Sequence, residues 1–78
     1  MNPVEILSQV RAQPFEPFRV HMSDGSSYEV PHPDFIQVTR YAVIIAVMPG
    51  QDQIPEKSVR CDPIHITRLE PIGAARVK

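Results

Sequence analysis

The chain has 78 residues, a formal net charge of −1, nine prolines and a single cysteine, Cys61. A chain of this length forms one domain, residues 1–78, and buries only about 60–65% of the surface that its unfolded form exposes. The near-neutral charge excludes a general electrostatic attraction to nucleic-acid phosphates or anionic membranes, and a lone cysteine excludes an intrachain disulfide.

The start of the chain has no basic region followed by an apolar run, so the sequence predicts no signal peptide. The longest apolar run, residues 41–48, is far shorter than the roughly 20 residues that span a membrane. A lone thiol without a secretory signal is typical of a reducing compartment. We therefore expect a cytoplasmic protein that makes no membrane contact.

The first predicted element is a short helix over residues 3–12. Asn2 is a suitable N-cap, Pro3 suits the first helical position, and Glu5 has the spacing of a capping box. Pro14 ends the helix because the residue before a proline avoids helical backbone angles. The apolar stripe that would dock this helix on the rest of the fold consists of Ile6, Leu7 and Val10, with Val4 at its edge.

A β-hairpin follows, with strands over residues 17–22 and 26–31. The first strand alternates apolar and polar residues, and the Asp-Gly pair after it is a common turn signal. A two-residue turn would place a glutamate on the apolar face, whereas a three-residue loop that ends at Gly25 pairs Val20 with Tyr28. The sequence therefore predicts a type I turn with Gly25 in the left-handed region, where it forms a β-bulge.

The middle of the chain predicts further strands. A Pro-His-Pro segment favours an extended corner before a short strand over residues 35–38, and we expect a tight reversal at residues 39–40. Residues 41–48 are apolar at every position, in two rows that face opposite sides of a strand. Such a strand is either a central strand covered on both faces or part of a subunit interface.

The last third predicts an exposed loop over residues 49–57, strands over residues 58–61 and 64–69, and a frayed tail over residues 71–78. In the last strand, Ile64 and Ile66 should share one face. The fold class is therefore α+β: a short N-terminal helix packed on a strongly bent antiparallel sheet of about five strands, or on a small partial barrel.

The segment from the end of the helix to the Pro-His-Pro corner resembles a family of short, functionally uncharacterised bacterial proteins. That family combines a Pro-Phe-x-Pro-Phe segment, an Asp-Gly turn and a His-Pro-acidic-Phe corner, and it has no assigned activity. The matching residues here are Pro14, Phe15, Pro17, Phe18, Asp24, Gly25, His32, Pro33, Asp34 and Phe35. The resemblance covers about residues 3–71 and implies a type of fold without a mechanism.

A looser likeness links the chain to Sm-like small barrels, which share the order of one helix and five bent strands. Asp24 and Gly25, with Tyr28 three residues later, are similar to the first Sm signature. The asparagine expected after the acidic residue and the Arg-Gly pair of the second signature are missing from the sequence. The RNA binding of Sm-like proteins is therefore not implied.

The two Pro-Phe pairs have a structural and a functional interpretation. Phe15 and Phe18 could dock in a groove of a partner, but a chain with three phenylalanines needs them in its core, and we favour the core. His32 and Asp34 could act as an acid–base pair, although capping of the corner by Asp34 is the favoured interpretation.

Catalysis and metal binding are both disfavoured by what the sequence lacks. Four potential zinc ligands exist in His21, His32, Cys61 and His65, but no Cys-x-x-Cys pair supports them. The neighbouring carboxylate of Asp62 should raise the pKa of the Cys61 thiol, and neither a nucleophile elbow nor a glycine-rich phosphate loop is present. We predict a protein that is no enzyme and needs no metal or cofactor.

The leading prediction for function is a non-catalytic module that binds a protein partner or a second copy of itself. The alternative is a small barrel that binds single-stranded nucleic acid weakly, and the third hypothesis is a metal-binding or enzymatic protein. Arg19 and His21 should lie on the outer, solvated face of their strand. The candidate binding surface comprises Arg19, His21, Tyr28, His32, Asp34, Arg60 and Arg68, with Arg40 and Tyr41 as further candidates for a nucleic-acid surface.

Overall fold

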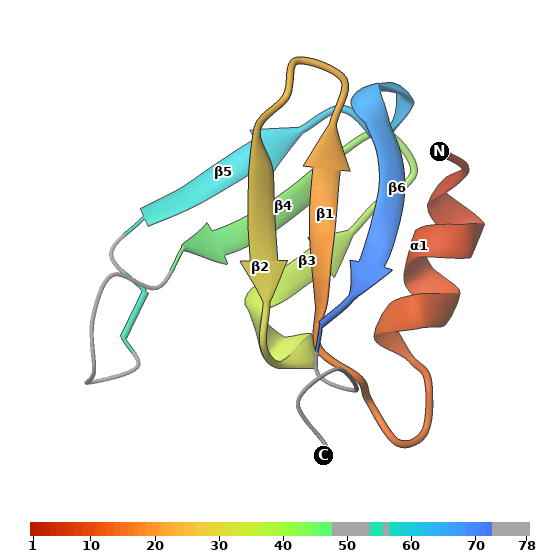
Figure 1. Cartoon of the computed structure of the whole chain (residues 1–78), viewed down its shortest axis with the longest axis vertical. Coiled ribbons are helices and arrows are strands. Elements are labelled where there is room, and N and C mark those ends of the chain that lie inside the picture. The colour runs from red at the N-terminus through yellow and green to blue at the C-terminus, as the bar shows by residue number, and fades with distance from the viewer. Residues whose placement is uncertain (48–53, 56, 73–78) are drawn as a thin grey trace.

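The computed structural model describes residues 1–47, 54–55 and 57–72, and it contains one N-terminal helix and six strands (Figure 1). Two short 3-10 helices precede the third and the sixth strands. The elements in chain order are α1 (Pro3–Val10), β1 (Phe18–Met22), β2 (Ser27–Val30), η1 (Pro33–Phe35), β3 (Ile36–Val38), β4 (Val43–Val47), β5 (Lys57–Cys61), η2 (Pro63–His65) and β6 (Ile66–Pro71).

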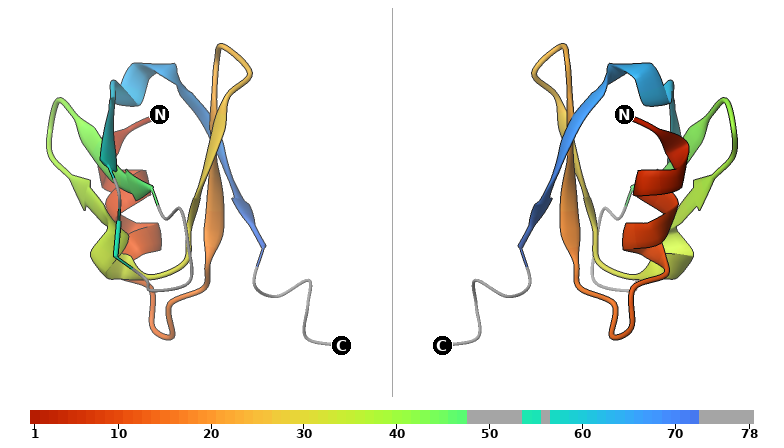
Figure 2. Two further views of the ribbon diagram at one scale, coloured as in Figure 1. Left: turned by 90° about the vertical axis from the view of Figure 1, so that its left-hand side faces the viewer. Right: turned by 90° about the vertical axis from the view of Figure 1, so that its right-hand side faces the viewer.

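The strands form two antiparallel sheets of three strands each, ordered β2-β1-β6 and β3-β4-β5. Figure 2 shows the two sheets as separate layers that face each other. The α+β class is confirmed, but the single bent sheet of about five strands is wrong. The chain crosses to the second layer at the corner after β2, and β6 returns to pair with β1, a long-range pairing that no local turn signal predicts.

The core lies between the two sheets. Phe18 is fully buried as predicted, while Phe15 is half-buried and packs against the core, with its ring centroid 5.9 Å from that of Phe18. The fully buried aliphatic side chains come from the helix and both sheets: Ile6, Val20, Val30, Val43 and Ile45. Because the helix contributes Ile6 and packs against β3, it completes the core of a domain too small to close with strands alone.

The N-terminal helix begins as predicted. The Asn2 Oδ1 accepts a hydrogen bond from the Val4 N–H at 2.8 Å, and Pro3 occupies the first helical turn. The helix ends at Val10, two residues earlier than expected, because Arg11 already leaves helical geometry. Val4, which was expected at the edge of the buried stripe, is 71% exposed.

The β1–β2 hairpin confirms the predicted register. Val20 pairs with Tyr28, and Phe18 pairs with Val30. Gly25 has a φ of 93°, in the left-handed region that the three-residue loop requires. The hydrogen bonds that close the loop run from the Gly25 N–H to the Met22 carbonyl and from the Met22 N–H to the Ser26 carbonyl.

Two other local predictions are wrong, and both errors concern 3-10 turns at prolines. The segment after His32 was expected to be extended, but it forms the 3-10 helix η1, in which the Phe35 N–H donates to the His32 carbonyl. The predicted strand over residues 64–69 begins only at Ile66, since η2 occupies the preceding residues. Ile64 therefore does not share a face with Ile66: it is 75% exposed, whereas Ile66 is buried.

Strand β4 is shorter than the apolar run that predicted it. Tyr41 lies in the turn before the strand, and Met48 is outside the described residues. Val43 and Ile45 face the core, while Ile44 is half-buried on the outer face. The strand is central in its sheet, as the first interpretation predicted, but its outer face is only partly covered. The predicted loop and tail lie mostly outside the described residues.

Candidate functional site

The turn between β3 and β4 holds Tyr41 in solvent. The Thr39 hydroxyl donates to the Ala42 carbonyl and accepts from the Ala42 N–H, each at 3.0 Å, and the Thr39 N–H donates to the same carbonyl at 2.8 Å. These bonds close the turn without the side chains of Arg40 and Tyr41. Tyr41 is 80% exposed as a result, although its neighbour Ala42 is buried.

The 3-10 helix η2 holds Ile64 in solvent by a similar arrangement. The Asp62 Oδ1 accepts a hydrogen bond from the Ile64 N–H at 3.0 Å, and Pro63 is buried beneath it. The N-terminal ammonium of Met1 donates to the Pro63 carbonyl at 2.6 Å and to the Ile66 carbonyl at 3.2 Å. These bonds fix the start of α1 beside η2, so the two elements form one continuous surface.

Two adjoining grooves cross this surface. A groove of about 410 Å³ is bordered by Tyr41, Ile64 and the start of the chain, and a groove of about 290 Å³ runs between α1 and β3. Both grooves are bordered by Asn2, Pro3 and Arg40. Six of the apolar residues that border them form what we call the Tyr41 surface: Pro3, Val4, Leu7, Val38, Tyr41 and Ile64.

The Tyr41 surface gathers most of the exposed apolar side chains of the described chain. Among the described residues four large hydrophobic side chains are exposed, and Val4, Tyr41 and Ile64 are three of them. The fourth, Ile54, precedes β5 in the chain and borders neither groove. A single exposed hydrophobic side chain is ordinary, but a contiguous group marks an interaction site.

Two opposite charges border the same grooves. Arg40 borders both, and Asp62 borders the larger one. Within the part of the chain that the structure describes, Arg40 forms no ion pair, and the Asp62 carboxylate binds only the backbone of η2. The surface therefore combines apolar side chains with one cation and one anion.

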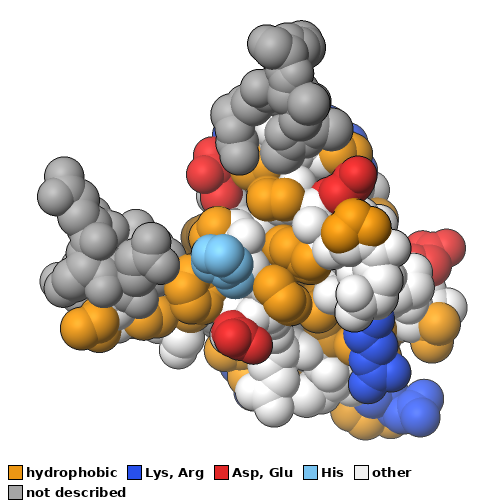
Figure 3. Space-filling view, turned by 90° about the horizontal axis from the view of Figure 1, so that it is seen from below, with side chains coloured by type: hydrophobic (Ala, Val, Ile, Leu, Met, Phe, Trp, Pro, Cys, Tyr) orange, Lys and Arg blue, Asp and Glu red, His pale blue; other side chains and the backbone are white. Residues whose placement is uncertain are grey.

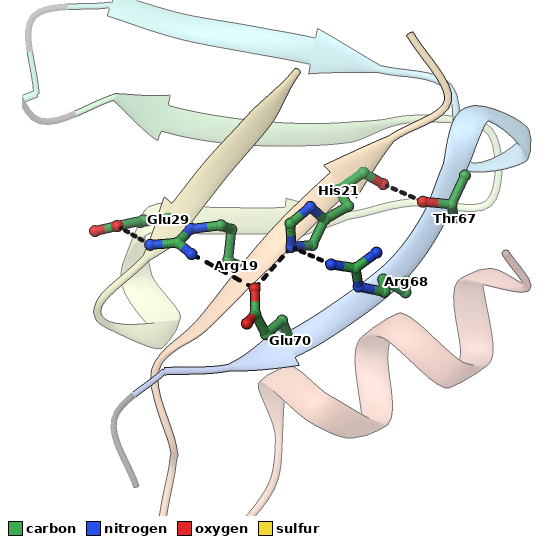
Figure 4. Close-up of polar contacts among 6 residues, drawn as sticks. All are labelled: Arg19, His21, Glu29, Thr67, Arg68 and Glu70. Atoms are coloured by element: carbon green, nitrogen blue, oxygen red, sulfur yellow. Dashed lines mark hydrogen bonds and ion pairs between the residues drawn. The ribbon is translucent and has the colours of Figure 1, made fainter. Parts of the chain in front are cut away.

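A different group of charged side chains lies on the outer face of the sheet β2-β1-β6 (Figure 4). Arg19 contacts Glu29 at 2.6 Å and Glu70 at 3.5 Å, and the His21 Nε2 lies 2.8 Å from the Glu70 Oε1. Arg19 and His21 were expected to be solvated, but their side chains are only 33% and 21% exposed. Cross-strand pairing of β1 with β2 and β6 brings these opposite charges together.

The geometry assigns the proton on His21. At 2.8 Å from a carboxylate oxygen, Nε2 must donate to Glu70. The same nitrogen cannot also accept from the Arg68 guanidinium 3.4 Å away, so Arg68 is a neighbouring cation rather than a hydrogen-bond partner. The His21 hydrogen bond, helped by the charges of Arg19, His21 and Arg68, lowers the pKa of the Glu70 carboxyl. Such exposed pairs contribute little to stability.

The structure unites only part of the predicted binding surface. Arg19, His21 and Arg68 meet on the outer face of β2-β1-β6. Tyr28 is on the inner side of β2, paired with Val20, and the remaining residues are on other elements. Arg60 belongs to β5 in the second sheet, Arg40 to the turn before β4, and His32 and Asp34 to the corner before β3.

The charge distribution does not favour a nucleic-acid surface. Glu29 and Glu70 lie within ion-pair distance of the cations on β1, where phosphates would have to bind. Seen from below, the described side chains show a central band of hydrophobic atoms, acidic groups around it, and Lys and Arg mainly at one margin (Figure 3). The alternative in which four arginines gather on one sheet face is not what the structure shows, because only two of them share a sheet. Arg19 and Arg68 are on β1 and β6, whereas Arg60 is on β5 of the other sheet and Arg40 lies between β3 and β4.

The four potential zinc ligands do not converge. Among the described residues, no three His, Cys, Asp or Glu side chains are placed to hold a metal ion. His21 binds Glu70, and the ring of His32 packs edge-on against Phe35 with centroids 5.5 Å apart. His65 lies beside Ser23 near the hairpin tip, and the His65 Nδ1 is 3.3 Å from the Ser23 Oγ.

Cys61 is a core residue at the end of β5, 5% exposed. Burial, and to a smaller extent the charge of Asp24, raises the pKa of its thiol. The direction agrees with the prediction, but the neighbouring Asp62 is not the cause. A groove of about 390 Å³ between the hairpin tip and β5 is bordered by Cys61, Ser23 and His65. A buried thiol of raised pKa is a poor nucleophile there.

Sequence reasoning missed most of the Tyr41 surface. Tyr41 was placed in a strand, Ile64 was expected to share a strand face with Ile66, and Val4 was expected at the edge of a buried stripe. The Asp-Pro pair before Ile64 is a 3-10 start signal that could have revealed its exposure, because Asp at an N-cap and proline at the first position favour a helical turn. No comparable signal marks the exposure of Val4.

No protein-family model, curated protein or solved structure matches the chain. None of the helices in the described part of the chain has the length and apolar character to cross a membrane.

Proposed function

We propose that the protein is a non-catalytic binding module that recognises another protein through the Tyr41 surface. The observation that supports this function is the clustering of Val4, Tyr41 and Ile64, each more than 70% exposed, around two adjoining grooves. Soluble monomers rarely leave such side chains grouped in solvent. Aromatic residues and arginine are also enriched where proteins bind each other, and Tyr41 follows Arg40 here.

The expected affinity is moderate. Full burial of one Val, Ile or aromatic side chain contributes about 1.5–3 kcal/mol, so these three supply roughly 5–9 kcal/mol. Association itself costs an estimated 4–15 kcal/mol, which leaves a transient complex unless the grooves and the charges of Arg40 and Asp62 add further contacts. The module is thus expected to bind reversibly. The cytoplasmic location and the family resemblance remain predictions.

Site-specific photo-cross-linking in cells of the source organism tests this proposal. A photoreactive phenylalanine analogue replaces Val4 in one variant and the equally accessible Ile54 in a control variant. We expect covalent protein adducts from position 4, including adducts between copies of the chain, and far fewer from position 54. Adducts that are absent at position 4, or equally abundant at both positions, would contradict the proposal.

Weak binding of single-stranded nucleic acid is the second candidate. It would use the outer face of β2-β1-β6, where Arg19, His21 and Arg68 lie close together. We rank it second because the carboxylates of Glu29 and Glu70 compete with phosphate for the same cations. Titration with single-stranded RNA and DNA at two salt concentrations tests it, since phosphate contacts make affinity fall as salt rises. Absence of binding at low salt excludes this function.

A further inference from the structure

We propose that the partner that covers the Tyr41 surface is a second copy of this chain, related to the first by a two-fold axis. The inference rests on the proposed function and names the occupant of the same surface. In this arrangement Tyr41 of each copy enters the groove between α1 and β3 of the other copy. Three properties of the surface support a second copy over an unrelated partner.

The first property is complementarity of shape within one patch. Tyr41 projects from its turn with 80% of its surface exposed, and a groove of about 290 Å³ bordered by Val4, Leu7 and Val38 adjoins it. In a two-fold interface the same patch of both copies is in contact, so a side chain that projects from one copy meets a recess of the other, and the reverse contact also forms. One patch must therefore carry both the projecting group and the recess. The two features lie side by side here, with Arg40 and Pro3 bordering both grooves.

The second property is complementarity of charge within the same patch. Arg40 and Asp62 border one groove, yet they form no ion pair with each other among the described residues. A two-fold axis through the patch lets Arg40 of each copy approach Asp62 of the other, so two equivalent ion pairs form and each charge is paired once. An unrelated partner would need a matching pair of opposite charges in the reverse order. The net charge of −1 adds little repulsion between two copies.

The third property is size. A standard interface covers about 800 Å² on each partner, which is about 15% of the 5372 Å² that this chain exposes. The Tyr41 surface draws on α1, β3, the turn after β3, and η2, so it spans enough elements for an interface of that order. A dimer also adds buried apolar surface to a chain whose own core is small.

Sedimentation equilibrium from about 5 to 500 µM tests the dimer, because a transient interface is expected in that range. We expect the wild-type chain to pass reversibly from monomer to dimer. Tyr41→Ser should raise the dissociation constant about 100-fold, because the substitution removes the tyrosine of both copies and the dimer loses two equivalent contacts. Ile54→Ser removes another exposed hydrophobic side chain, 66% exposed and outside the surface, and should leave the dissociation constant within about twofold.

The charge pairing has its own variants. Arg40→Gln and Asp62→Asn should each raise the dissociation constant about fivefold. The double variant should also raise it only about fivefold, because both substitutions remove the same ion pairs. Asn keeps the side-chain oxygen that caps η2, so the fold is preserved. Circular dichroism and urea unfolding of each variant at low concentration confirm that the monomer is intact.

Several results would overturn the inference. These are a chain that stays monomeric throughout, a dimer that Tyr41→Ser leaves unchanged, a dimer that Ile54→Ser weakens equally, or an open-ended polymer in place of a closed dimer. The failure of the dimer is distinguishable from failure of the proposed function. A monomer whose position 4 cross-links to a different protein keeps the function and rejects only the second copy.

Discussion

The two tight turns between antiparallel strands use their side chains in different ways. In the loop between β1 and β2, the Asp24 carboxylate accepts hydrogen bonds from the Ser26 N–H at 2.9 Å and from the Ser26 hydroxyl at 2.6 Å, and Gly25 supplies the positive φ. In the turn between β3 and β4, Thr39 alone closes the backbone. The first loop therefore commits its polar groups to folding, whereas the second leaves Arg40 and Tyr41 free to contact a partner.

If Thr39 alone closes the second turn, its replacement should have the largest effect on stability among the turn residues. Thr39→Val keeps the shape of the side chain but removes both hydroxyl hydrogen bonds and leaves the part-buried Ala42 N–H without its acceptor. We expect a loss of about 2 kcal/mol in the free energy of unfolding, measured by urea denaturation. Thr39→Ser keeps the hydroxyl and should lose less than half as much. Equal losses in the two variants would contradict the role of the hydroxyl.

The first loop depends on the backbone of Gly25 rather than on one side chain. A Cβ atom added at Gly25 would meet no heavy atom within 4 Å, so Gly25→Ala tests the conformation alone. We expect it to lower the free energy of unfolding by about 1–2 kcal/mol, because the φ of 93° is strained for alanine. Gly25→Asn should be milder, since asparagine tolerates the left-handed region better. An unchanged stability of the alanine variant would mean that the loop rearranges.

Acid should weaken the first loop more than the second. The hydrogen bonds from Ser26 lower the pKa of the Asp24 carboxyl below its usual value of 3.8. The folded chain therefore binds this proton less readily than the unfolded chain, so the stabilisation is complete above the unfolded pKa and is lost as the pH falls through the folded one. Ser26→Ala removes the hydroxyl donor, and its stability should fall less steeply below about pH 5. Parallel pH profiles for wild type and variant would contradict this assignment.

The smallest effect on stability is expected for the residue most important for binding. Tyr41→Ser should change the free energy of unfolding of the monomer by less than about 0.5 kcal/mol, because Tyr41 is 80% exposed and its turn is closed by Thr39. Urea denaturation at a protein concentration well below the dissociation constant isolates this value. A loss of more than about 1.5 kcal/mol would show that Tyr41 supports the fold rather than a partner.

The comparison of the two turns also explains what the sequence could predict. The N-cap at Asn2, the β1–β2 register and the left-handed Gly25 depend on neighbours within a few residues, and all three predictions are confirmed. The pairing of β6 with β1 joins segments more than 40 residues apart, so no local pattern indicated two sheets in place of one. Local signals specify turns well, but they do not specify which strands become neighbours.

The candidate surface was missed for a related reason. Periodicity arguments assign apolar residues to the interior, so Ile64 and Tyr41 were placed on strands. Their exposure follows from 3-10 and turn geometry set by Asp62 and Thr39, whose polar side chains bind the backbone nearby. An apolar residue that follows a capping Asp-Pro pair is thus a better candidate for a surface contact than its hydrophobicity suggests.

The Tyr41 surface is the proposed binding site of this protein, and its proposed partner is a second copy of the chain. The most direct test is to follow backbone amide chemical shifts by nuclear magnetic resonance while the protein is diluted. We expect concentration-dependent shifts that cluster at residues 3–8, 38–42 and 62–65, with the face of β1 and β6 around Arg19 and His21 unaffected. Shifts that concentrate on that polar face, or spectra that do not change with concentration, would contradict the account.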